Sequence, residues 1–121
     1  MTPELEALAL RAIAAGAPVP GWEPASVGSI VADGKLVYEV VWGDKAPGRR
    51  GLILLPVLSD FRWLGWVQDE VRRRGYLWAM TNIDCEGDEC RLKVHKRHEA
   101  AEWTAHQSWE AAIVAMLEAT L

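Results

Sequence analysis

The sequence has little of several features that would narrow its function at once. Its 121 residues include two cysteines and one phenylalanine, and no run of eighteen apolar residues occurs. Without such a run the chain has no candidate for a membrane-spanning helix, so we expect no membrane partner. The first residues, MTPELEAL, carry acids where a signal peptide carries bases. We therefore expect a cytoplasmic protein in which residues 1–121 form one domain, long enough to bury a core without disulfides.

Sequence motifs for common enzyme chemistry are also missing. The chain has no Gly-rich phosphate loop, no GxSxG and no HExxH, so we expect no cofactor and no catalytic residue. Its formal net charge of −4 gives no bulk attraction to nucleic acid or anionic lipid. Scattered carboxylates and histidines, such as His106 with Glu102 or Glu110, still leave a metal-assisted enzyme as an alternative.

What the sequence does contain is a regular series of helix and strand patterns. The predicted order of the elements is α-β-β-β-α-β-β-β-α. We expect an α+β fold in which helices pack on a mainly antiparallel sheet, an architecture known as an α/β/α sandwich. Residues 29–42 read as a hairpin with its turn at Asp33-Gly34, and its second arm is apolar on both faces. The other predicted elements are helices at 3–15, 60–74 and 109–121 and strands at 51–56, 76–84, 90–97 and 102–106.

The helix ends carry recognisable signals. Thr2, Ser59 and Ser108 each stand where a hydroxyl caps the first turn of a helix. In the middle helix an apolar stripe predicts core residues, and the arginines at its end complement the helix dipole. The residues of that stripe are Trp63, Leu64, Val67 and Val71.

The stretch NIDCEGDEC, residues 82–90, contains both cysteines and four carboxylates. It fits the tip of a hairpin closed on residues 86–89, with Cys85 opposite Cys90. A redox-sensitive pair of these cysteines and a metal site are the alternatives. The metal reading is poor because C-x4-C supplies two of the four ligands that a structural zinc needs, so we expect no metal.

That hairpin register defines a candidate binding surface. It pairs Asn82 with Lys93 and puts an apolar face around Leu92. On the opposite face it gathers one aromatic ring and three basic side chains, a combination that binds acidic or phosphate-bearing partners. The residues predicted for this surface are Trp78, Lys93, His95 and Arg97.

From Pro56 onward the chain resembles the phage ABA-sandwich domain, a family of small bacteriophage proteins. The stretches that carry the resemblance are PVLSDFRWLGWVQDEVRRRGY, RLKVHKR and EWTAHQSWEAAIVAMLEATL. They cover about half of the chain, and the last includes Glu110-Ala111 followed by Ala115 and Leu117. The resemblance implies a helix–sheet–helix sandwich, the cytoplasm of an infected host cell, and no assigned activity.

Three functions follow from these patterns. The first is a non-enzymatic phage accessory protein that binds a host protein, because Trp and Arg are frequent interface anchors and the chain has seven tryptophans. The second is a nucleic-acid or nucleotide-binding module that uses the Trp78 surface. The third is the metal-assisted enzyme.

Overall fold

In the residues that it describes, the computed structural model gives three helices and six strands in the predicted order, so the α+β prediction is confirmed. The residues that the structure describes are 1–20, 26–34, 36–43, 51–82 and 90–121. The predicted hairpin tip and Cys85 lie outside them. The chain divides into two compact units, Met1–Leu64 and Gly65–Leu121, and each is described by itself. The prediction of a single domain stays a prediction.

The first unit begins with helix α1, Pro3–Ala14, which has the predicted N-terminal cap. Thr2 Oγ1 accepts a hydrogen bond from the Leu5 amide at 3.2 Å. This contact satisfies one of the amides that the first turn of a helix leaves unpaired. Ala9 and Ala12 are fully buried, and α1 packs against strand β3, Leu52–Pro56. Short side chains on this stripe allow close contact between the helix and the strand.

The first sheet has the antiparallel order β1-β2-β3, with β1 at Ile30–Asp33 and β2 at Leu36–Trp42. Since Asp33 already pairs with Leu36, the turn begins at Gly34, one residue later than predicted. Gly34 has φ of +60°, a conformation that costs glycine little. β2 is buried on both faces as predicted, except at Glu39, which is half-buried, and at Trp42, which is exposed.

Helix α2, Phe61–Arg73, shows the predicted apolar stripe but a different cap. Trp63, Val67 and Val71 are buried, whereas Leu64, which was also predicted for this stripe, is half-buried. The residue that caps the helix is Asp60, not Ser59, because the Asp60 carboxylate accepts from the Arg62 amide at 2.9 Å. A carboxylate at this position also interacts favourably with the positive end of the helix dipole, which a neutral hydroxyl does only weakly.

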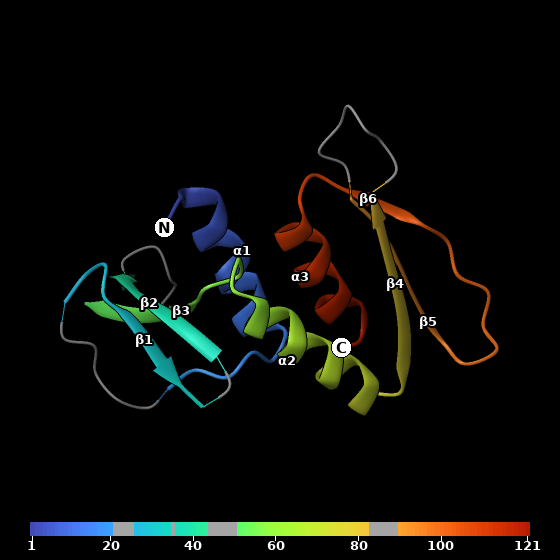
Figure 1. Cartoon of the computed structure of the whole chain (residues 1–121), viewed down its shortest axis with the longest axis horizontal. Coiled ribbons are helices and arrows are strands. Elements are labelled where there is room, and N and C mark those ends of the chain that lie inside the picture. The colour runs from blue at the N-terminus through green and yellow to red at the C-terminus, as the bar shows by residue number, and fades with distance from the viewer. Residues whose placement is uncertain (21–25, 35, 44–50, 83–89) are drawn as a thin grey trace. The chain divides into compact units, whose positions relative to one another are not determined.

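The second unit is built on a sheet of order β4-β5-β6, in which all pairs are antiparallel. The strands are β4 at Tyr76–Asn82, β5 at Cys90–Lys96 and β6 at Thr104–His106. Helix α3, Trp109–Ala119, contacts β5 and β6 and lies along one face of this sheet (Figure 1). Its cap is the predicted one, since Ser108 Oγ accepts from the Ala111 amide at 3.1 Å.

The pairing of β4 with β5 differs from the predicted register by three residues. Asn82 pairs with Cys90 rather than with Lys93, and Met80 pairs with Leu92. Leu92 and Cys90 are buried on the face that α3 covers. The observed register places Met80 and Trp78 on that same face, whereas the predicted one placed Ile83 and Thr81 there. Met80 and Trp78 are large apolar side chains, and their partial burial on the face that α3 covers favours this register.

The three arginines that follow one another at the end of α2 have separate roles. Arg74 donates to the Leu117 carbonyl at 3.3 Å and to Thr120 Oγ1 at 3.1 Å, which ties the end of α2 to the end of α3. Arg73 and Arg74 both donate to the Glu70 carboxylate. Arg72 is exposed. This arrangement matches a helix end held by ion pairs better than a site for nucleic acid.

The ion pairs of Glu70 predict that the stability of the second unit depends on pH. Hydrogen bonds from Arg73 hold the pKa of its carboxyl below the ordinary value of 4.5. A carboxyl whose pKa is lower in the folded state than in the unfolded state stabilises the fold at pH values above its unfolded-state pKa. This stabilisation is lost as the pH falls through its folded-state pKa. Between about pH 6 and about pH 3 the Glu70→Gln variant should therefore lose less stability than the wild type, and thermal unfolding at the two pH values measures both losses. Equal losses in the two proteins would contradict this role.

Candidate functional site

The structure separates the four residues predicted to form one binding surface. Lys93 and His95 lie on the same face of β5, opposite Ala79 and Leu77 of β4. Trp78 pairs with Val94 on the other face, which α3 covers, and it is half-buried. Arg97 follows the last residue of β5 and is exposed. Because a shift of three residues is odd, it moves Trp78 away from the lysine and histidine.

We call the face of the β4-β5-β6 sheet opposite α3 the open face. From β5 it holds the basic residues Arg91, Lys93 and His95, which are half-buried. The neighbouring strands contribute small or apolar residues: Leu77, Ala79 and Thr81 of β4 and Ala105 of β6. Leu77 is 49% exposed. The open face therefore has a basic row flanked by apolar side chains.

Trp103 completes the open face and was not among the predicted site residues. The Lys93 ammonium lies 4.9 Å from the centre of the Trp103 ring, within the range of a cation–π interaction. The ring is 43% exposed. The position of Trp103 follows from the pairing of Leu92 with Thr104, because extending this register by one residue brings Trp103 beside Lys93.

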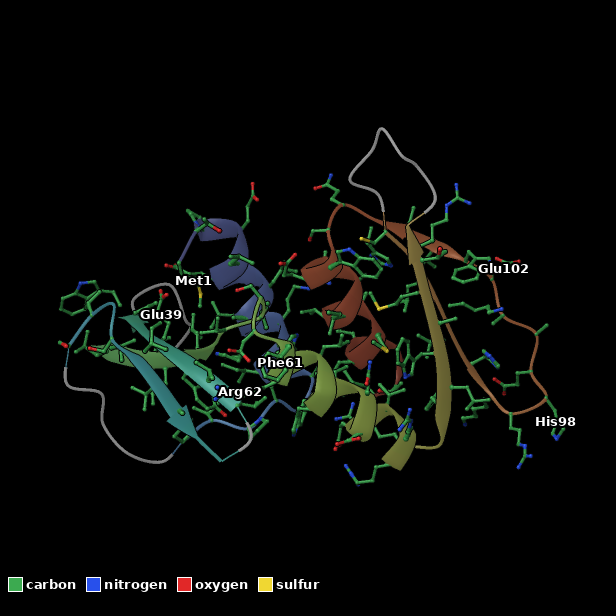
Figure 2. The ribbon with its side chains drawn as sticks, in the orientation of Figure 1. Met1, Glu39, Phe61, Arg62, His98 and Glu102 are labelled. Atoms are coloured by element: carbon green, nitrogen blue, oxygen red, sulfur yellow. The ribbon has the colours of Figure 1, made fainter. Side chains whose placement is uncertain are left out.

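The turn after β5 is held by its own backbone and by one acid. The Lys96 amide donates to Glu99 Oε2 at 3.3 Å, and the Glu99 amide donates to the Lys96 carbonyl at 3.1 Å. Between them His98 has φ of +68°, an uncommon conformation for a residue with a side chain. Figure 2 shows His98 at this turn, far along the hairpin from Glu102. Arg97 belongs to this turn and not to the open face.

The predicted redox pair is only half within the described residues. Cys90 is 2% exposed and pairs with His106 of β6 on the face covered by α3. His106 Nε2 lies 2.8 Å from Thr104 Oγ1. The described residues hold no group of three or more His, Cys, Asp or Glu side chains placed to share a metal ion. A disulfide or redox role for Cys85 and Cys90 stays a prediction.

The first unit contains a pocket of about 360 Å³ beside α1 and β2. The Met1 ammonium lies 2.8 Å from Glu39 Oε2 at its wall, and Figure 2 shows the two residues side by side. The hydrogen bond from the ammonium to the Glu39 carboxylate raises the pKa of the ammonium above its ordinary value of 8.0. Trp42 also lines the pocket. Glu39 was recognisable in the sequence as the one acid in the apolar segment LVYEVVW.

Comparisons with protein-family models, curated proteins and solved structures found no match for this chain. In the part of the chain that the structure describes, no helix is both long enough and apolar enough to cross a membrane. The candidate site therefore has to be judged by its own geometry and charge.

Proposed function

We propose that this protein acts by binding, and that the open face of the β4-β5-β6 sheet is its contact surface for another protein with an acidic surface. The observation that carries the proposal is the exposure of two apolar side chains beside the basic row: Leu77 of β4, opposite His95, and Trp103, whose ring contacts Lys93. A sheet face that meets only water normally presents polar side chains. Exposed apolar side chains around a basic row are typical of an interface for a charged partner.

A protein partner is favoured over a nucleic acid by the position of the aromatic rings. Base stacking needs an open ring surface amid cations, and Trp78 lies on the face that α3 covers. Trp103 does lie beside the basic row, but Lys93 covers one surface of its ring. The formal net charge of −4 also opposes general attraction to phosphate backbones. Nucleic acid thus becomes the alternative that the binding experiments have to exclude.

The same proposal includes a bacteriophage origin and a host protein as partner. Its support is the resemblance of the second half of the chain to the phage ABA-sandwich domain, together with the order of helices and strands. On this proposal the protein works in the cytoplasm of the infected cell by binding a host protein. The motifs of the resemblance are signals of packing and capping, so they support the fold more strongly than the partner.

Footprinting of a captured complex tests this function. Protein recovered from a bacterial host lysate is exposed to hydroxyl radicals, which oxidise accessible side chains, with and without its partner. We expect the partner to protect Leu77 and Trp103, because both lie on the contact surface. Phe61 and Trp42, which are exposed in the first unit, serve as controls and should react equally in both samples.

Protection of Phe61 or Trp42 with none at Trp103 would place the interface elsewhere and contradict the proposal. A complex that is lost on nuclease treatment would identify the partner as nucleic acid.

A further inference from the structure

The two edges of the β4-β5-β6 sheet differ in how well they are protected against pairing with another strand. β6 is three residues long, and short edge strands pair poorly. β4 has seven residues, YLWAMTN, and contains neither a charged residue nor a proline. Among the described residues β4 pairs with β5 alone. Its other edge therefore lacks the two commonest devices, charge and proline, that prevent strand addition.

The sequence of β4 is also compatible with itself. In an antiparallel pair of identical strands around a twofold axis at Ala79, Ala79 meets its own copy and Trp78 meets Met80. Leu77 then meets Thr81. Each of these pairs is free of charge repulsion, and a Trp–Met contact is favourable.

We propose that β4 pairs with β4 of a second copy of this chain, which joins two three-stranded sheets into a continuous antiparallel sheet. The twofold axis stands perpendicular to the sheet, so both α3 helices cover one side and both open faces lie on the other. Leu77, Ala79 and Thr81 of the two copies then form an apolar strip between two basic rows. The inference rests on the β4 edge and does not depend on the proposed function.

The mass in solution tests this pairing directly. Sedimentation of the wild-type chain over a range of concentrations should show a dimer of twice 13.4 kDa at the upper end. Ala79→Glu should raise the dissociation constant on the order of tenfold or more, because two glutamates meet at the axis. Within one copy the same glutamate faces Lys93, so the monomer loses little.

The matched control is Ala105→Glu, which places the same charge opposite Arg91 at the other edge of the sheet. It should dimerise like the wild type. A wild-type chain that stays monomeric at every concentration would overturn the proposal, and so would equal weakening by the two variants.

A second variant tests the axis without adding charge. Ala79→Cys places two thiols directly opposite each other across the axis, close enough for a disulfide. Under oxidising conditions it should form a covalent dimer, whereas Ala105→Cys and the wild type should not. Equal crosslinking of all three proteins would contradict pairing at Ala79.

Discussion

Replacing Trp63 with alanine is expected to destabilise the protein severely. The side chain is 1% exposed and belongs to the buried stripe of α2 with Val67 and Val71. Removing a buried tryptophan costs about 3–5 kcal/mol, a large part of the roughly 5–15 kcal/mol by which a domain is stable. Thermal unfolding should shift down by roughly 10 °C or more, or the variant should be insoluble.

Trp42→Ala is the matched control for this prediction. Trp42 belongs to the same unit but is 62% exposed, so its truncation should cost less than about 1 kcal/mol. If Trp63→Ala unfolds at the wild-type temperature, α2 does not bury the face assigned to it. If the two variants are equally destabilised, burial is not the cause.

The helices were predictable from the sequence because their signals are local. Thr2 and Ser108 each stand one residue before a segment whose apolar residues recur with helical spacing. Each residue caps the helix that follows it. The same logic failed at α2, where Ser59 and Asp60 both have oxygen atoms suited to a cap. Two adjacent capping residues leave an ambiguity of one residue, which the backbone geometry decides.

The register of the second hairpin was not predictable, because two registers both give sensible pairs. Asn82 with Lys93 is as reasonable in isolation as Asn82 with Cys90. The difference is made by α3, which follows in the chain and covers the face of Leu92. Contacts between distant segments therefore decided the composition of the candidate site, and Trp103 replaced Trp78 beside Lys93. Only the pairing of β5 with β6 reveals that exchange.

The second prediction with a large expected effect concerns partner binding. Replacing both Arg91 and Lys93 with glutamate reverses two charges at the centre of the open face. Each lost contact to an acidic partner costs about 1.4 kcal/mol or more, so affinity should fall on the order of a hundredfold. Both side chains are only half-buried, and the fold should therefore survive, as circular dichroism and thermal unfolding can verify.

A control variant with the same change in net charge tests whether the loss of binding comes from the open face or from the altered net charge of the protein. Arg62→Glu with Arg72→Glu alters two exposed arginines of α2 and should leave binding unchanged. Because charge interactions are screened by salt, the difference between the two double variants should be larger at low ionic strength.

The most direct measurement is the affinity of the captured partner for the wild type and for these two double variants, side by side. The open face as contact surface predicts that the Arg91 and Lys93 variant loses binding while the Arg62 and Arg72 variant binds like the wild type. A folded Arg91 and Lys93 variant with wild-type affinity would show that the open face makes no contact with the partner.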